Sequence, residues 1–124
     1  MKIGIFNQKD GIFTAAYLFQ AHNIMIYITQ LVYIRDSKAA VFHQFEEYAL
    51  PIIPKYNGVL LLRIRPDQPA FIEANMETPY EIHLVSFPSD SDFQRFMQDE
   101  ERKQFLHLKE DSIKSVVLIK GEQL

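Results

Sequence analysis

The sequence contains neither cysteine nor tryptophan in its 124 residues. Without cysteine the chain can form no disulfide bond and no thiolate metal site, and it has no thiol nucleophile. It also has no apolar run close to the about 20 residues that a membrane-spanning helix needs. We therefore expect a soluble protein that does not enter a membrane, with the cytoplasm as its default location.

An excess of basic residues is also missing. The chain has 16 acidic residues against 13 basic ones, which gives a formal net charge of -3. The basic residues are scattered and form no stripe beside aromatic residues. Since nucleic-acid-binding surfaces concentrate positive charge, nucleic acid is not an expected partner. No motif identifies a reaction, and none indicates a cofactor.

What the sequence does contain is enough apolar character for one domain. Hydrophobic residues make up 48% of the chain, and a chain of this length buries roughly two thirds of the surface that it exposes when unfolded. We predict a domain over residues 25–124 and an accessory N-terminal extension over residues 1–24. The alternatives for the extension are an upstream segment before a natural start at Met25 and a weak signal peptide, which Lys9 and Asp10 would interrupt.

Four segments combine β-branched, aromatic and other apolar residues as strands do. The first, residues 24–33, is apolar on both alternating faces, which is typical of a central strand. The others are residues 59–65, 80–87 and 115–120. Residues 71–74 could add a short extended segment before the third strand.

A helix is predicted after the first strand, with Asp36 or Ser37 as its cap. Pro51 should end or kink it because proline lacks an amide hydrogen, and Asn57-Gly58 tolerates a left-handed helix end. Helical spacing divides its residues into two faces. We expect burial of Val41, Phe42, Phe45, Tyr48, Ala49 and Ile52, and exposure of His43, Gln44, Glu46 and Glu47.

A second helix is predicted to begin at Ser89-Asp90-Ser91-Asp92, where short oxygen-bearing side chains accept hydrogen bonds from free amides. Asp99 is expected to cap a further short helix that continues to Leu106. In these helices Phe93, Phe96 and Met97 should face the sheet, whereas Arg102 and Lys103 should stay in solvent.

From residue 25 onwards the predicted order is strand, helix, strand, strand, helix, strand. This order predicts an α+β protein, a ferredoxin-like βαββαβ sandwich with an antiparallel sheet and both helices on one face. The other face would expose a larger apolar patch than soluble monomers usually do. We therefore expect a homodimer, a dimeric α+β barrel in which two sheets meet through this open face.

Polar residues on apolar strands are the candidates for a site, because a buried polar group is costly without a partner or a ligand. Alternation places Glu81 and His83 on one strand face, where His83 could move a proton as a catalytic residue with Glu81 orienting it. Ordinary cross-strand pairing is the structural alternative. Arg63 could bind an anionic substrate group or form a salt bridge at an edge or between subunits, and Tyr27 could donate a hydrogen bond to a substrate or simply pack.

The four histidines do not indicate a metal site. They are His22, His43, His83 and His107, and they lie on four different segments without the close spacing of metal ligands. No metal is therefore predicted. His43 and His107 are expected at the surface.

Residues 25–121 resemble the domain-of-unknown-function family 1330, within the dimeric α+β barrel superfamily. The resemblance rests on the order and spacing of short motifs. They are Asp36 at the helix start, Phe42 and Phe45 on that helix, Pro51, the turn Lys55-Tyr56-Asn57-Gly58, Arg63, the Phe87-Pro88-Ser89 strand end, and the helix with Phe96 followed by an acidic short helix.

The sequence departs from the pattern of that family at three places. It has Asn57-Gly58 where the family often has paired glycines, Ile64-Arg65 where a glycine pair follows the arginine, and Ser86 where the family has a glutamate. If those residues shape a ligand site in relatives, this chain binds something else or nothing. Superfamily relatives include cofactor-free monooxygenases, isomerases and haem-handling proteins, so the resemblance implies no single chemistry.

Two functions remain open at this point. The first is a small-molecule-binding protein or cofactor-independent enzyme with a pocket at the sheet. The second is a non-catalytic homo-oligomeric interaction domain. A cavity with convergent polar groups would favour the first, and a fully packed interior would favour the second.

Overall fold

The computed structural model describes residues 24–124, so that residues 1–23, and with them His22 and nearly all of the predicted extension, lie outside the described range. None of the helices in this range is long and apolar enough to cross a membrane. The elements are, in order, β1 (Ile26–Ile34), α2 (Ala39–Ala49), the 3-10 helix η2 (Leu50–Tyr56), β2 (Val59–Ile64), the 3-10 helix η3 (Gln68–Ala70), β3 (Glu81–Phe87), α3 (Asp90–Met97), α4 (Glu100–Lys103), α5 (Leu106–Ser112) and β4 (Ile113–Gly121).

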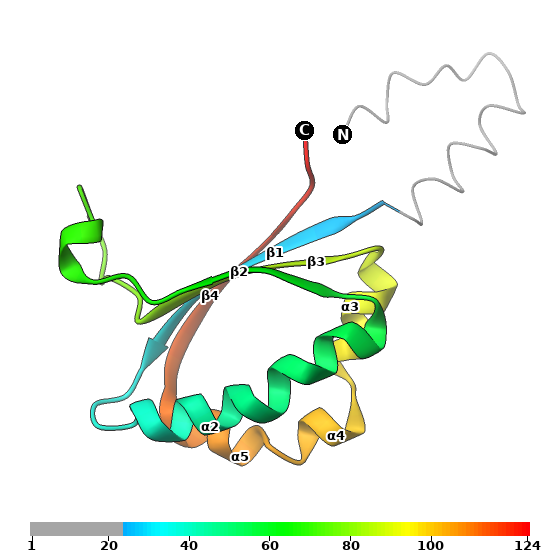
Figure 1. Cartoon of the computed structure of the whole chain (residues 1–124), viewed down its shortest axis with the longest axis horizontal. Helices are drawn as coiled ribbons and strands as arrows, with labels where there is room; N and C mark the ends of the chain where they lie inside the picture. Colours follow the sequence, from blue (N-terminus) through cyan, green and yellow to red (C-terminus); the bar gives the residue numbers. More distant parts are fainter. Residues whose placement is uncertain (1–23) are drawn as a thin grey trace, which may run out of the picture.

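The strands form one antiparallel sheet in the order β2-β3-β1-β4. The two central strands, β1 and β3, pair so that Gln30 lies opposite His83 and Val32 lies opposite Glu81. The α-helices lie together on one face of this sheet (Figure 1). The architecture confirms the predicted α+β, ferredoxin-like sandwich.

The core lies between the helices and the sheet face that they cover. Side chains alternate along a strand, so the even-numbered residues of β1 and the odd-numbered residues of β3 face the helices. Ile28 and Phe87 are almost fully buried there and cluster with Ile53 of η2 and Phe93 of α3. The strands therefore present Glu81 and His83 to the same interior as these apolar side chains.

The end of α2 follows the predicted proline signal. The α-helix stops at Ala49 and tightens into η2, which contains Pro51. Asn57 then adopts the left-handed conformation, with φ 64°. A Cβ atom on Gly58 would lie 2.6 Å from side-chain atoms of Ile53 and of Phe87, so glycine is needed where η2 meets β3.

Local predictions around the other helices have mixed outcomes. Ser89 and Asp99 cap α3 and α4 as predicted. The predicted cap of α2 is wrong, because Lys38 holds that position without a capping side chain and Ser37 instead adopts a left-handed turn conformation. Residues 71–74 form no strand. The predicted single helix after Asp99 is two helices, and the second, α5, packs against α2.

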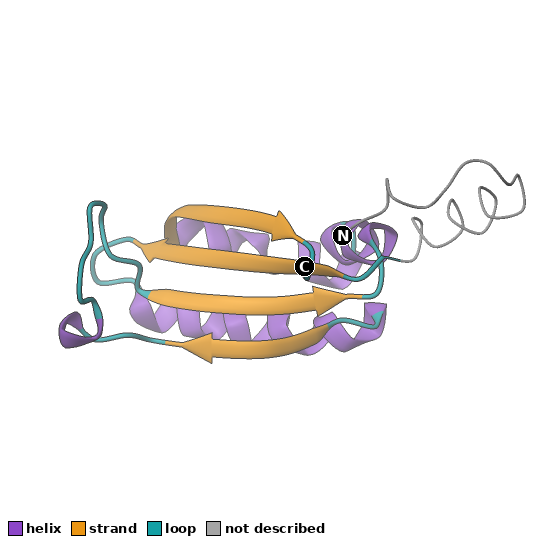
Figure 2. Cartoon of the chain, turned by 90° about the horizontal axis from the view of Figure 1, so that it is seen from above, coloured by secondary structure: helices purple, strands orange, loops and turns teal. Residues whose placement is uncertain are grey.

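Within residues 24–124, no helix covers the other face of the sheet, which faces the viewer in Figure 2. Strand pairing places Leu62 and Ile64 of β2 on this face, next to Leu84 and Ile82. Val117 and Ile119 of β4 lie on it beside β1. Leu62, Ile64, Val117 and Ile119, which we call the open face, are each between 38% and 54% exposed. The apolar surface predicted from the strand patterns is therefore present.

Candidate functional site

Five charged or titratable side chains meet where β2, β3 and α2 come together. Glu81 and His83 lie two residues apart on β3, and Arg63 pairs with His83 across the sheet from β2. Glu46 approaches from α2, and Arg65 follows the end of β2. We call these five residues the charged cluster. Glu46, Glu81 and His83 are each at most 6% exposed.

The arginines hold both carboxylates in place. Arg63 Nη2 donates to Glu46 Oε1 at 2.7 Å, and Arg63 Nε donates to Glu81 Oε2 at 3.3 Å. Arg65 Nε donates to Glu81 Oε1 at 2.7 Å. His83 Nε2 lies 2.5 Å from Glu81 Oε2 and 2.9 Å from Glu46 Oε2. Both oxygens of Glu81 therefore have hydrogen-bond donors.

Glu46 is less completely bonded than Glu81. Its Oε2 atom is buried and accepts no hydrogen bond from any residue of the described range, although it lies close to His83 Nε2. A ring nitrogen carries one hydrogen, and the shorter contact, to Glu81, takes it. Oε2 of Glu46 is therefore left without a donor. A buried acceptor without a donor lowers the stability of the folded state.

The three buried titratable residues of the charged cluster, Glu46, Glu81 and His83, have pKa values shifted in different directions. Burial raises the pKa of Glu46, the neighbouring charge of Glu81 raises it further, and contacts with His83 and Arg63 only partly oppose this. Burial would also raise the pKa of Glu81, but hydrogen bonds from His83 and Arg65 outweigh it and hold that pKa well below the usual range. Burial would lower the pKa of His83, yet its contacts with both carboxylates raise it to about 9. His83 is therefore an imidazolium at neutral pH.

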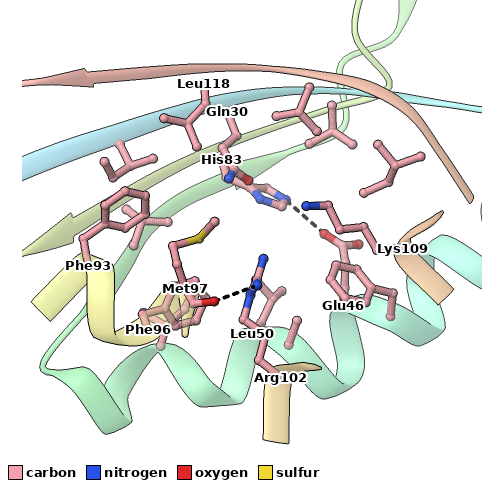
Figure 3. A pocket seen from close by; sticks show the side chains of 18 of the residues that line it. Gln30, Glu46, Leu50, His83, Phe93, Phe96, Met97, Arg102, Lys109 and Leu118 are labelled. Atoms are coloured by element: carbon pink, nitrogen blue, oxygen red, sulfur yellow. Dashed lines mark hydrogen bonds and ion pairs between the residues drawn. The ribbon is translucent and has the colours of Figure 1, made fainter. Parts of the chain in front are cut away.

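A cavity of about 190 Å³ adjoins the cluster between the sheet and the helices (Figure 3). Apolar side chains provide 15 of its 20 lining residues. The five polar ones converge from different elements: Gln30 and His83 from the sheet, Glu46 from α2, Arg102 from α4 and Lys109 from α5. Because a cavity of about 150 Å³ can hold benzene, this one is large enough for a small ring compound.

Glu46, Glu81 and His83 also resemble a set of metal ligands, since their ligand atoms lie within 4.8 Å of one another. The arginines decide against this role. Arg63 and Arg65 already donate to three of the four carboxylate oxygens and balance both negative charges. A divalent cation would have to displace them, so the donor set does not fit a metal, and we describe it as an ion-pair network.

The structure brings together three of the four residues singled out in the sequence. Glu81, His83 and Arg63 contact one another directly or through shared oxygens, but only His83 of these three lines the cavity. Tyr27 does not join them. Tyr27 is an odd-numbered residue of β1, so its side chain lies on the open side of the sheet. Its hydroxyl group donates a hydrogen bond to Gln123 Oε1 at 3.1 Å. Within one chain Tyr27 cannot share a ligand with His83.

The prediction of exposure is wrong for two polar residues that matter to the site. Glu46 is only 3% exposed and Arg102 only 8% exposed. Glu46 lies one helical turn after Phe42 and one before Ala49, so its position within the apolar stripe was the available signal. Arg102 and Lys109 had no such signal, because their burial depends on how α4 and α5 close the cavity. Tyr48, predicted to be buried, is 41% exposed.

His43 does not belong to the charged cluster. Its Nε2 atom lies 2.7 Å from the hydroxyl oxygen of Tyr80, and the two rings stack. His107, on α5, does not line the cavity. Neither contributes to the candidate site.

Comparison with solved structures finds the same fold in proteins of low sequence identity. A protein of unknown function from Rhodopseudomonas palustris is 14% identical, with a TM-score of 0.72 over 96% of each chain. A dimeric protein of unknown function from Bacteroides fragilis, with a ferredoxin-like fold, is 16% identical, with a TM-score of 0.58 over 80% of this chain and 96% of that chain.

A third similar structure comes from Caulobacter crescentus and has an inferred role as an antibiotic biosynthesis monooxygenase. It is 12% identical, with a TM-score of 0.62 over 88% of this chain and 98% of that chain. Other similar structures belong to the NIPSNAP and Dabb families. No protein-family model and no curated protein matches the sequence. The comparisons therefore show that the chain has a ferredoxin-like α+β fold.

Proposed function

We propose that this protein is a small-molecule-binding protein of the dimeric α+β barrel type, and that Glu46 and His83 give its cavity cofactor-independent acid–base activity. The observation that carries the proposal is the buried Oε2 atom of Glu46 beside an apolar cavity: within residues 24–124 it accepts no hydrogen bond, and the His83 ring nitrogen that lies 2.9 Å away gives its hydrogen to Glu81. A buried acceptor without a donor destabilises the fold. Groups with shifted pKa values, here Glu46, Glu81 and His83, are concentrated at functional sites. A purely structural interaction domain accounts for the open face but gives no reason for this arrangement.

The protonation states assign different roles to the two groups. Glu46, with its raised pKa, accepts a proton from a bound molecule. His83 is already protonated at neutral pH, so in the predicted role of moving a proton it acts as an acid. Glu81 holds its Nε2 atom, which leaves Nδ1 to donate a hydrogen bond to a ligand. The matching reaction class is proton abstraction next to a carbonyl, with His83 stabilising the oxygen that gains negative charge.

Arg63 and Glu81 are positioning residues in this proposal. Arg63 binds the other oxygen of Glu46 and so directs Oε2 towards the cavity side. This replaces the role of direct substrate binding predicted for Arg63, since its side chain does not line the cavity.

The cavity can be tested with probes of known size. We would label the methyl groups of isoleucine, leucine and valine with carbon-13 and follow Ile28, Val85, Val116 and Leu118, which line the cavity. Benzene, benzamide or benzoate should shift these signals. The variant Ala49→Leu, which adds volume inside the cavity, should abolish the shifts. If none of the three probes moves any cavity methyl signal, the proposal fails.

We also propose that the protein is a homodimer joined through the open face. The apolar side chains there have no cover within the described part of the chain, and the Bacteroides fragilis protein of the same fold is dimeric. A stable interface of this kind should bury about 1,500 Å² or more in total. Two sheets packed face to face would then form the barrel.

The dimer can be broken at a chosen position. Ile119→Lys places a charge in the proposed interface and should give a monomer in sedimentation or light scattering at micromolar concentration. Ile72→Lys is the matched control, because Ile72 is fully exposed in the connection between β2 and β3. A wild-type protein that is already monomeric at this concentration would rule out the proposal.

We propose, from the order of its motifs, that the chain belongs to domain-of-unknown-function family 1330. Arg63, Pro51 and the turn that contains Asn57-Gly58 support the assignment through their structural roles at η2 and β2. A sequence alignment built from close homologues would test it, and motifs that fail to align would contradict it.

A further inference from the structure

Two basic side chains reach the cavity from outside the charged cluster. Arg102 is 8% exposed and points from α4 into the middle of the cavity, and Lys109 enters beside His83 and Glu46 (Figure 3). In the described part of the chain, the guanidinium of Arg102 donates a hydrogen bond to the Met97 carbonyl oxygen at 3.4 Å and lies 5.3 Å from the centre of the Phe96 ring. Among residues 24–124, neither cation has an ion-pair partner.

The acid whose charge acts on Arg102 is Asp99, and it cannot serve as an ion-pair partner. Asp99 precedes α4, but its Oδ1 atom accepts the backbone amide of Arg102 at 2.8 Å and its Oδ2 atom accepts from Lys55 and Tyr56. Buried cations are normally paired, because removing a charge from water is expensive. Burial lowers the pKa of Arg102. Burial also lowers the pKa of Lys109, and the nearby positive charge of Arg102 lowers it further.

The charge at the cavity wall therefore differs in sign from that of the chain. Arg102, Lys109 and His83 contribute three cationic groups, against one carboxylate from Glu46. The whole chain has a formal net charge of -3. Even with Lys109 neutral, the cavity wall keeps a positive balance inside an apolar enclosure.

We propose that the cavity binds a small organic anion, a carboxylate with an aromatic or branched aliphatic body, and that Arg102 and Lys109 hold the carboxylate group. The inference rests on the proposed function, because it names the ligand class of the same cavity. The planar guanidinium can bind both oxygens of a carboxylate. The apolar walls enclose the remaining carbon skeleton, and the volume of about 190 Å³ limits it to roughly the size of one ring.

Three probes of nearly equal size separate charge from shape. Benzoate, benzamide and benzylammonium would be titrated into the full chain, with the cavity methyl signals as the readout. Benzoate should bind at least about tenfold more tightly than benzamide, the difference expected for one charge-assisted hydrogen bond. Benzylammonium should bind more weakly than both.

Variants then locate the anion. Arg102→Met and Lys109→Met should each weaken benzoate binding about tenfold and leave benzamide binding unchanged, because each removes one charged donor. Arg102→Lys should restore part of the loss. Lys103→Met is the control, because it removes the same charge. Lys103 lies next to Arg102 in α4 but does not line the cavity. Should Arg102→Met fail to fold, Lys109→Met makes the same prediction alone.

The outcomes separate this inference from the proposed function. If benzamide binds as tightly as benzoate, the cavity binds small molecules but not by charge, and the inference is wrong while the proposed function stands. An equal loss of benzoate affinity in Lys103→Met would also overturn it. If no probe shifts a cavity methyl signal, both fail together.

Discussion

Two buried carboxylates of this protein differ in how completely they are bonded. Asp99, at the start of α4, has donors on both oxygens: the Arg102 amide on Oδ1, and Lys55 and Tyr56 on Oδ2. Glu46, on α2, has Arg63 on one oxygen and no hydrogen bond on the other. Glu46 and Asp99 are each 3% exposed. Burial alone therefore does not explain their different protonation behaviour.

The difference lies in the donors around Asp99 and in the burial of Glu46 beside a second carboxylate, Glu81. Hydrogen bonds led by the one from Tyr56 hold the pKa of Asp99 well below its usual range, whereas burial and the charge of Glu81 raise the pKa of Glu46. A fully bonded carboxylate is a fixed structural anion. A partly bonded one keeps the ability to take up a proton. We infer that Asp99 ties η2 to α4, while Glu46 serves chemistry at the cavity.

The largest effect should come from breaking the fully bonded carboxylate. Asp99→Ala removes a helix cap and leaves its donors unpaired, so the free energy of unfolding should fall by about 3 kcal/mol. Urea denaturation measures it. Asp90→Ala is the control, because Asp90 forms an exposed ion pair with Lys120, and its loss should cost under about 1 kcal/mol. An equal loss of unfolding free energy in both variants would contradict the structural role of Asp99.

A smaller effect should follow from the titration of His83. Its pKa is raised from 6.5 to about 9 in the folded state. The resulting stabilisation is complete below pH 6.5 and disappears as the pH rises through 9, since deprotonation then favours unfolding. The free energy of unfolding of the wild type should therefore fall by about 2 kcal/mol over this window, relative to His83→Gln.

This comparison with His83→Gln is needed because Lys109 titrates with the opposite sign. Its lowered pKa favours the folded state as the pH rises. Both proteins contain Lys109, so its contribution cancels in the difference. A difference that stays constant from pH 6 to 10 would show that His83 is neutral in the folded protein.

The smallest effect on stability should come from Glu46 itself. Glu46→Gln removes a charge whose pKa the fold raises, so the free energy of unfolding should change by less than about 1 kcal/mol at neutral pH. Glu81→Gln, which removes the charge bonded by Arg63, Arg65 and His83, should cost about 3 kcal/mol. Urea denaturation of the two variants side by side checks the prediction, and similar losses would erase the distinction between the two carboxylates.

The fold was largely predictable because its determinants are local. Strand alternation, Pro51, and the Ser89 and Asp99 caps each act within a few residues, and together they specify the order of elements. Glu81 and His83 were found for the same reason, since two residues on one strand share a face. The weak point was the N-terminal boundary of α2, where Ser37 takes a turn conformation that its residue type does not reveal.

The cavity was not predictable, because it depends on contacts between distant elements. Polar residue type suggested exposure for Glu46 and Arg102, and only tertiary packing buries them. Lys109 lies on α5, a helix whose start is not marked by a capping residue. Tyr27 illustrates the opposite problem: alternation placed it on a face but could not tell which face meets the helices.

The most direct test of the central claim is the titration of the Glu46 carboxyl carbon by carbon-13 NMR, with Asp99 as the reference in the same sample. We predict that Glu46 titrates above its ordinary value of 4.5, whereas Asp99 remains ionised well below its own ordinary value of 3.8. A Glu46 signal that titrates at or below 4.5 would contradict the account, because Glu46 would then be a structural anion like Asp99.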